Sequence, residues 1–413
     1  MAPRRLDPAD LASALPPGGR TLVVAASGES LVLADAVMRA GEALGAMTFT
    51  GIFVPGLNTR TYLANPKCRV ETFFLTPELK AAGRAATFLP LCYSQILERL
   101  RAIRIDAALF MATRPDGEGN CSFGPIVDFL AELWPKIRVR IAHINSKLPR
   151  VRGDGAIPFS ELTAYLEGEQ ELLGFVETAD DPVAEAVAAH ISPFIGDGAT
   201  LQTGLGKIPT AALRALRGRR NLRIHSGLIG EAVVDLEEAG ALASGVAITG
   251  GVAIGSRRLY DRVGGAAYRF HPVSFTHSPR VIAGIENFVS LNSALEVDLF
   301  GQAYAEFGPA GLMSGPGGAS DFARAAWAAG GLRIVALSAS AAKGGISRIV
   351  APQASLGPVS LGRMDTDIVV TEFGSADLRG LDHRRRAGKL IAIAPPAHRD
   401  TLEQSWAALA AKF

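Results

Sequence analysis

Short apolar runs alternate with amphipathic or alanine-rich stretches along most of this chain, and this alternation limits the fold more than any other feature. In the first half, strands are predicted over residues 21–25, 47–52, 107–111 and 139–144, with helices such as 30–44 and 93–103 between them. Continuous apolar strands separated by helices are typical of a parallel sheet that is covered on both faces.

The second half repeats the pattern. Strands are predicted over residues 222–225, 246–249, 333–337, 367–371 and 390–394. With 413 residues the chain also exceeds the usual size of one domain. The sequence therefore predicts an α/β fold of two domains, 1–188 and 189–413, with mostly parallel sheets. A cleft is expected between the domains, with ligands at the carboxyl ends of strands.

Composition narrows the class of protein. The net charge is +2 with both signs mixed, and the densest basic run, residues 384–386, reads as a solvated helix face, so no nucleic-acid partner is expected. No apolar run reaches the roughly 18 residues that span a bilayer, and the N-terminal residues lack a secretory pattern. The cysteines Cys68, Cys92 and Cys121 have no metal-ligand spacing. We expect a cytoplasmic protein with no membrane association and no metal.

Two glycine-rich turns are the candidate ligand-binding motifs. The first is Gln-Thr-Gly-Leu-Gly-Lys-Ile-Pro at 202–209, before a helix expected over 210–217. The second is Ser-Gly-Pro-Gly-Gly-Ala-Ser-Asp-Phe at 314–322, before a helix expected over 322–329. Backbone N–H groups at helix starts favour an anionic or carbonyl-bearing ligand. An ordinary strand-to-helix connection explains either turn alone equally well.

Further motifs follow in a fixed order. These are residues 114–124 (Arg-Pro-Asp-Gly-Glu-Gly-Asn-Cys-Ser-Phe-Gly), 145–154 (Asn-Ser-Lys-Leu-Pro-Arg-Val-Arg-Gly-Asp), 290–302, 342–350 (Ala-Lys-Gly-Gly-Ile-Ser-Arg-Ile-Val) and 370–380. Together with the two turns they resemble the acetyl-CoA hydrolase/transferase family, also described as 4-hydroxybutyrate CoA-transferase-like. The resemblance covers nearly the whole chain.

The resemblance implies a CoA-transferase fold of two related α/β domains, with acyl-CoA such as acetyl-CoA and a small carboxylic acid as substrates. It also implies a homodimer. The residues that it implies for CoA binding are Gly204, Leu205, Gly206, Lys207, Ile208, Leu295, Gly318 and Lys343. A lysine offers a point charge to an anionic ligand, and backbone N–H groups can hold a thioester oxygen. For Leu295, plain core packing is an equally good interpretation.

The sequence departs from the family where the chemistry is expected. Members of the family that this chain resembles use a glutamate nucleophile in an Ile-His-x-Glu motif. The corresponding run here is Ile-His-Ser-Gly. The resemblance therefore places Gly227 in the nucleophile position. His277 stands where the family has an asparagine, and it is a candidate hydrogen-bond donor or general base. Glu231 is a candidate replacement carboxylate, about 6 Å along if a helix has begun, or an ordinary first-turn acid.

Three functions stay open at this point. The first is transfer or hydrolysis of an acyl-CoA through an altered site. Hydrolysis with His277 as the base is favoured over double-displacement exchange, because the missing side chain leaves room for water. The second is acyl-CoA binding without catalysis. The third is a different acyl-CoA reaction, with Gly227 making space for a bulky acyl group.

Overall fold

The computed structural model describes residues 2–175, 181–309, 311–341, 345–352, 354–355 and 357–412. The chain forms two compact units that are discontinuous in sequence. The first unit comprises the described residues of 1–176 and 248–276, and the second those of 177–247 and 277–413. The predicted division between residues 188 and 189 differs from this grouping, since 248–276 return to the first unit. As a boundary between folding domains, that division stays a prediction.

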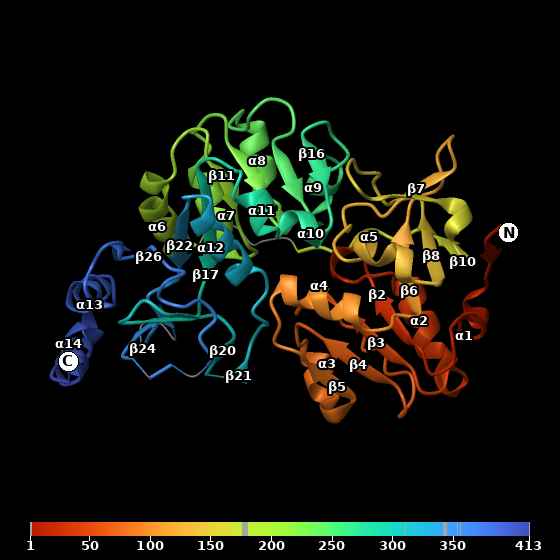
Figure 1. Cartoon of the computed structure of the whole chain (residues 1–413), viewed down its shortest axis with the longest axis horizontal. Coiled ribbons are helices and arrows are strands. Elements are labelled where there is room, and N and C mark those ends of the chain that lie inside the picture. Colours follow the sequence, from red (N-terminus) through yellow and green to blue (C-terminus); the bar gives the residue numbers. More distant parts are fainter. Residues whose placement is uncertain are drawn as a thin grey trace. The chain divides into compact units, whose positions relative to one another are not determined.

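The first unit is built on one parallel sheet (Figure 1). The strand order is β1-β10-β8-β6-β2-β3-β4-β5. The bounds are β1 Arg4–Arg5, β10 Ala164–Gly168, β8 Val139–Asn145, β6 Ala107–Ala112, β2 Arg20–Val23, β3 Thr48–Gly51, β4 Arg69–Thr72 and β5 Ala86–Phe88. Every neighbouring pair in this order is parallel. The four strands predicted in the first half are confirmed.

Helices bury apolar residues on both faces of this sheet. Val23 of β2 packs in one core with α1 (Leu11–Ala14) and α2 (Leu31–Ala40). Leu22, its neighbour on the same strand, packs in a second core with α4 (Tyr93–Ala102) and α5 (Leu130–Leu133). Successive strand side chains point to opposite faces, so an apolar strand needs cover on both sides.

Smaller elements complete the first unit. They are α3 (Pro77–Ala81), the antiparallel pair β7 (Asn120–Ser122) and β9 (Ala156–Pro158), and, in the returning segment, β14 (Ile248–Gly250), β15 (Val252–Ile254), α9 (Arg257–Tyr260), β16 (Tyr268–Phe270) and α10 (Val273–Thr276). β14, which overlaps the predicted strand 246–249, pairs with β16 in parallel.

The second unit has its own mostly parallel sheet. Its strands run in the order β12-β11-β17-β22-β26-β27. The bounds are β12 Arg223–His225, β11 Thr200–Gln202, β17 Phe288–Ser293, β22 Leu332–Ala336, β26 Ile368–Thr371 and β27 Gly374–Asp377. All pairs are parallel except the β26–β27 hairpin. The strands predicted over 222–225, 333–337 and 367–371 are confirmed.

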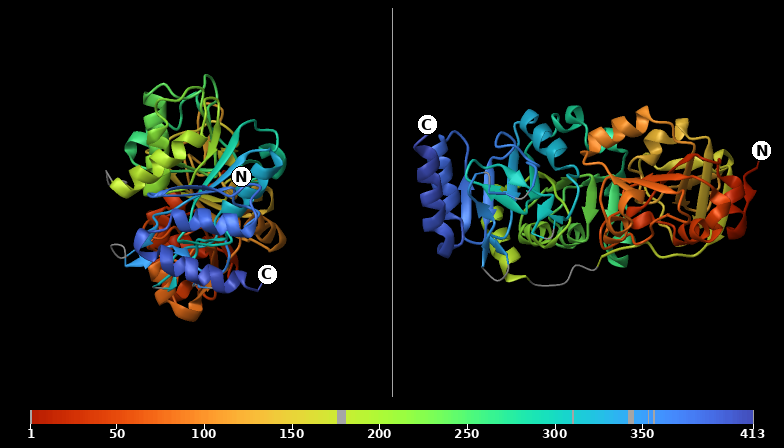
Figure 2. Two further views of the ribbon diagram at one scale, coloured as in Figure 1. Left: turned by 90° about the vertical axis from the view of Figure 1, so that its left-hand side faces the viewer. Right: turned by 90° about the horizontal axis from the view of Figure 1, so that it is seen from below.

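Helices of the second unit pack against these strands. α12 (Ala319–Ala328) packs on β17 and β22, α7 (Lys207–Ala215) on β17, and α6 (Pro182–Ile191) on β26. The others are α8 (Ala232–Glu238), α11 (Pro279–Ile282), α13 (His383–Ala392) and α14 (Arg399–Ala410), and the last two lie side by side at the blue end of the chain (Figure 2). Short strands fill the loops: β13 Leu228–Gly230, β18 Glu296–Asp298, β19 Ala303–Tyr304, β20 Phe307–Gly308, β21 Gly311–Leu312, β23 Ser340–Ala341, β24 Ile346–Ser347 and β25 Ile349–Val350.

The strand predicted over residues 390–394 is wrong. Residues 390–392 form the last turn of α13, and the helix starts at an Asp382 N-cap whose side chain accepts a hydrogen bond from the Arg385 N–H at 2.8 Å. Ala387, Leu390 and Ile391 are buried with the spacing of one helix face. A short apolar run fits both patterns, and here the preceding polar turn already belongs to the helix.

The described part of the chain shows neither a membrane-spanning helix nor a cluster of metal-ligating side chains. No helix in that part of the chain is long and apolar enough to cross a membrane. Nor do three or more His, Cys, Asp or Glu side chains gather there in an arrangement that could hold a metal ion.

Candidate active site

Three adjacent parallel strands of the second unit end next to the sequence-predicted site residues. β12 leads to Gly227, β11 leads to the 204–208 turn, and β17 leads to Leu295. The ends of β12 and β11 are tied together, because the Ser226 hydroxyl donates to the Thr203 carbonyl at 2.8 Å. Strand order reverses between β11 and β17, and ligands of open α/β sheets bind at such a point beyond the carboxyl ends.

A buried polar network holds β11 and β17 in place beneath this edge. The Ser290 hydroxyl donates to Gln202 Oε1 at 2.7 Å, and Asn292 Nδ2 donates to the Ser290 hydroxyl at 2.9 Å. All three side chains are buried. Satisfied polar networks of this kind fix a unique geometry. The sequence motifs 202–209 and 290–302 contain these residues, but their contact was not predicted, because Gln202 and Ser290 lie 88 positions apart.

The first glycine turn is an open platform at the start of α7. The helix begins at Lys207, three residues earlier than predicted, with Gly206 as its N-cap at φ +115°, a conformation that favours glycine. A Cβ at Gly204 or Gly206 would meet no atom within 4 Å. The Lys207 ammonium pairs with Asp181 at 3.0 Å. The backbone face of this turn is therefore accessible, as binding of a ligand to its N–H groups requires.

The second glycine turn leads into α12. Gly318 is the N-cap of that helix, which begins at Ala319 and so starts before the predicted residue 322. Phe322 lies in its first turn and is buried. This turn is closed on one side, because a Cβ at Gly318 would lie 2.7 Å from His277 Nε2 and 3.2 Å from Phe322 Cε2.

His277 fills the space beside both glycines. A Cβ at Gly227 would lie 2.7 Å from His277 Nε2 and closer still to its Cε1. The ring also packs on Phe322, with centroids 4.5 Å apart and planes tilted by 45°. Only 4% of His277 is exposed. The imidazole thus occupies the position into which a side chain at residue 227 would project. The expectation that the missing side chain leaves room for water there is wrong, because the His277 ring fills that space.

Burial, followed by the nearby His225, lowers the pKa of His277 to about 3. Desolvation disfavours the charged imidazolium, and a second histidine adds to that effect. His277 is therefore neutral at physiological pH. A neutral imidazole donates one hydrogen bond and accepts another, but with this pKa it is a weak base.

The other predicted residues are placed as follows. Leu295 is half-buried, and its N–H donates to the Tyr304 carbonyl at 2.7 Å. Glu231 follows β13, so the helical spacing considered for it is wrong: three extended residues put it roughly 10 Å beyond Leu228. Lys343 lies outside the described residues.

Comparison with known proteins agrees with this architecture. Residues 18–177 match the model of the acetyl-CoA hydrolase/transferase N-terminal domain, and residues 255–406 match that of its C-terminal domain. The chain is 34% identical to 4-hydroxybutyrate coenzyme A transferase of Clostridium kluyveri over 333 residues, 78% of this chain and 77% of that protein. The chain belongs to the acetyl-CoA hydrolase/transferase family.

Solved structures support the same assignment to the acetyl-CoA hydrolase/transferase family. RipA from Yersinia pestis superposes with a TM-score of 0.90 at 27% identity, covering 98% of this chain and 97% of its own. The 4-hydroxybutyrate CoA-transferase abfT-2 from Porphyromonas gingivalis gives a TM-score of 0.81 at 28% identity, covering 99% and 98%. The predicted fold class is confirmed.

Membership of the acetyl-CoA hydrolase/transferase family makes this an enzyme class that acts on CoA thioesters and carboxylic acids, and it does not favour the alternative of a non-catalytic binding protein. The individual roles stay predictions: Gly227 as the nucleophile position, His277 and Glu231 as catalytic residues, and the two turns as CoA contacts. Asp298 is a structural acid, since its carboxylate accepts from Tyr304 and Gln302.

Proposed function

We propose that this chain hydrolyses an acyl-CoA thioester without a covalent intermediate at residue 227. Water attacks the thioester carbonyl carbon, the carbon–sulfur bond breaks, and the CoA thiolate leaves and takes up a proton. The observation that carries the proposal is the His277 ring over Gly227, because the volume of a nucleophilic side chain is taken by an imidazole.

The two turns support CoA binding. α7 and α12 both begin at glycine N-caps beside the ends of β11 and β17, and their first N–H groups lack partners within the helix. Such N–H groups hold phosphate or carbonyl oxygens well. The open surface over Gly204 and Gly206 leaves room for the thioester arm of CoA.

In this proposal His277 acts as a neutral hydrogen-bonding group. With a pKa of about 3, only about one molecule in 10⁴ carries the imidazolium at pH 7. A neutral ring N–H polarises a carbonyl, or the other nitrogen orients a water, without any charge change in the site. This role agrees with the burial of the ring better than general-base catalysis does.

The proposal is tested with four proteins: the natural chain, Gly227→Glu, His277→Asn, and the double variant. Acetyl-CoA is supplied with labelled acetate, and release of CoA thiol and label exchange into acetyl-CoA are both measured. We expect thiol release without exchange in the natural chain, and exchange in the double variant, where the smaller asparagine leaves room for a carboxylate. Exchange through a trapped glutamyl thioester in the natural chain would contradict the proposal, and Glu231 would be the first residue to examine.

We also propose that the protein works as a cytoplasmic homodimer. The resemblance to CoA-transferases supports the dimer, and the sparse, unpaired cysteines support a reducing compartment. Light scattering of the purified chain and fractionation of the source cells test these two points. A monomer at working concentration would refute the first, and recovery outside the cytoplasmic fraction the second.

A further inference from the structure

The outer face of α12 carries a large apolar side chain at a position where helix patterning predicts a polar one. The helix buries its inner face in the second unit, and the buried residues are Phe322, Ala323, Ala325 and Ala326. The opposite face meets solvent, and solvent-facing helix positions are normally polar or charged. Trp327 lies on that face and is 70% exposed. Tryptophan is highly buried on average in folded proteins, so its exposure here needs an explanation.

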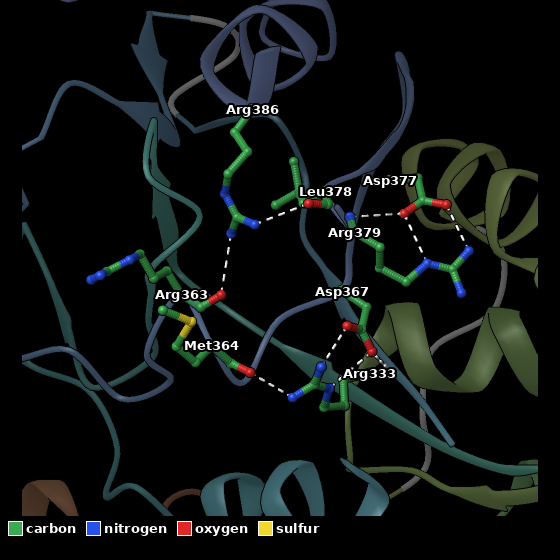
Figure 3. A network of polar contacts seen from close by, with 8 residues as sticks. All are labelled: Arg333, Arg363, Met364, Asp367, Asp377, Leu378, Arg379 and Arg386. Carbon is green, nitrogen blue, oxygen red and sulfur yellow. Dashed lines mark hydrogen bonds and ion pairs between the residues drawn. The ribbon is translucent and has the colours of Figure 1, made fainter. Parts of the chain in front are cut away.

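A second exposed apolar side chain lies on the element beside this face. Arg324, one helical turn before Trp327, approaches Asp365 with 3.9 Å between Nε and Oδ2. This pair brings the loop that contains Asp365 alongside α12. Met364 belongs to the same loop and is 69% exposed, and its carbonyl accepts a hydrogen bond from Arg333 that holds the loop in place (Figure 3). We call Arg324, Trp327, Met364 and Asp365 the Trp327 patch.

The composition of the Trp327 patch is typical of a protein–protein interface. Aromatic residues, Met and Arg are enriched in interfaces relative to the rest of the surface, and Trp and Arg are enriched among the residues that contribute most to binding. A tryptophan side chain offers about 150–250 Å² of contact surface. Single exposed apolar residues are common, but two large ones on neighbouring elements with charged groups between them mark an interaction site.

The charges of the Trp327 patch indicate which partner it fits. The Arg324 side chain is 71% exposed, and its distance of 3.9 Å from Asp365 is long for an ion pair. A patch with one cation and one anion is complementary to itself, because a two-fold axis brings each Arg324 to the Asp365 of a second copy. A uniformly acidic or basic partner would leave one of the two charges facing a like charge. The patch therefore fits a second copy of this chain.

We propose that the Trp327 patch is the contact face of a two-fold symmetric homodimer. The inference rests on the homodimer of the proposed function and deepens it, because it assigns the face through which the two copies meet. Gly318 at the start of α12 is nine residues from Trp327, about 13 Å along the helix axis. Substitutions in the patch thus do not touch the residues of the candidate active site.

The first test uses Trp327 as its own probe. Trp134 and Trp406 are each only 8% exposed, so a change of fluorescence with protein concentration reports on residue 327. We expect the emission of the full chain to shift to shorter wavelength as concentration rises, in parallel with the dimer fraction in sedimentation velocity. Trp327→Ser should raise the dimer dissociation constant at least about tenfold and remove the shift. Val246→Ser, at another exposed apolar position of the same unit, should dimerise like the natural chain.

The second test reverses charges within the Trp327 patch. Arg324→Asp should weaken the dimer because it sets two carboxylates against each other at each contact, and Asp365→Arg should weaken it because it sets two guanidinium groups together. An equimolar mixture of the two variants should form a heterodimer, since every such contact in it pairs opposite charges. Arg217→Asp reverses an exposed charge elsewhere in the same unit and should leave the dimer unchanged.

The outcomes separate the assigned face from the homodimer itself. A dimer with the natural dissociation constant in Trp327→Ser would overturn the face and leave the homodimer standing. A mixture of Arg324→Asp and Asp365→Arg that stays monomeric, although each variant keeps its melting temperature, would also overturn the face. A natural chain that is monomeric at every concentration would overturn both. Hydrolysis of the thioester is measured separately, on variants of residues 227 and 277, and is independent of these results.

Discussion

Gly227, Gly318 and His277 form one packing unit at the scale of single residues. The imidazole lies so close to both glycine backbones that neither position accepts a side chain while the ring stays in place. The ring is confined in turn by Phe322. The residue types tolerated at these three positions therefore depend on one another, although His277 is 50 positions from Gly227 and 41 from Gly318 in the chain.

This interdependence gives a prediction for stability. Gly227→Ala and Gly318→Ala should each destabilise the protein by about 1–3 kcal/mol, because each added methyl overpacks the ring. Adding His277→Ala should recover part of each loss, with a coupling energy of about 0.5–3 kcal/mol by urea denaturation. Gly204→Ala is the control, since a Cβ there meets nothing within 4 Å. Strictly additive effects of residues 227 and 277 would contradict the packing.

The same contacts decide which glycine variant can test CoA binding. Gly318→Val would meet His277 and Phe322 and so perturb the fold itself. Gly204→Val projects into open space above the first turn and is the cleaner steric block. We expect it to weaken CoA binding at least tenfold in a calorimetric titration, with an unchanged melting temperature. Unchanged CoA affinity in the folded variant would exclude this turn as a contact.

The pKa of His277 predicts a pH dependence of stability. The folded-state pKa of about 3 lies below the ordinary value of 6.5, so between these values the unfolded chain binds the extra proton. The contribution of this histidine is therefore complete above pH 6.5 and declines as pH falls toward 3, by at most about 1.4 kcal/mol per pH unit. Urea denaturation at pH 7, 5 and 4 should show a smaller acid loss for His277→Asn. A parallel acid loss in both proteins would contradict it.

At the scale of elements, periodicity predicted the sheets well because buried parallel strands are continuously apolar. The runs that became β2, β6 and β8 carry this signal on both faces. The error at 390–394 arose because five apolar residues in a row suit a buried helix end as well as a strand. The feature that favours a helix over a strand lies outside this run, at Asp382, which caps the N-terminus of α13.

Arg386 shows how α13 is fastened to the rest of its unit. Its guanidinium donates to the carbonyls of Leu378 at 3.0 Å, and of Phe300 and Arg363 at 3.2 Å each (Figure 3 shows the bonds to Leu378 and Arg363). Nearby, Arg333 forms a bidentate pair with Asp367, which ties β22 to the start of β26.

The planar guanidinium of Arg386 donates all three hydrogen bonds to these carbonyls together, and a lysine ammonium group cannot reproduce that geometry. Arg386→Lys should therefore lower the free energy of unfolding by about 1–3 kcal/mol. Arg384→Lys, at an exposed position on the same helix, should change it by less than about 0.5 kcal/mol. Equal effects of the two substitutions in urea denaturation would show that the carbonyl contacts do not stabilise α13.

At the scale of the whole molecule, the chain leaves the first unit and returns to it. Residues 248–276 supply the Ala253 N–H that donates to the Pro125 carbonyl, and the Ala253 carbonyl that accepts from Ser27. Sequence reasoning assigned this segment to the second domain because it follows residue 189 in the chain, and no local pattern marks the return.

Because residues 248–276 return to the first unit, we expect that residues 1–188 alone do not form a stable domain. The fragment lacks the partners of Ser27, Pro125 and Val127, so buried polar groups are left unsatisfied. We expect circular dichroism and urea titration to show a loosely folded fragment without a cooperative transition. A cooperative transition of native-like amplitude would show that 1–188 is an independent folding domain after all.

The candidate site was predictable in its parts and not in its assembly. Glycine-rich sequence marked the two turns, and the family resemblance indicated Gly204 to Ile208, Gly318 and Gly227, whose roles stay predictions. That the His277 ring would fill the place of a side chain at 227 required the packing of α12 and the Phe322 ring, which no local pattern encodes.

The Gly227–His277 contact also constrains the order in which the two residues can be exchanged. A side chain acquired first at residue 227 meets the imidazole, so that step costs stability while the histidine is present. Exchange of the histidine for a smaller residue first leaves room for the second change. While His277 stays, residue 227 is therefore held without a side chain.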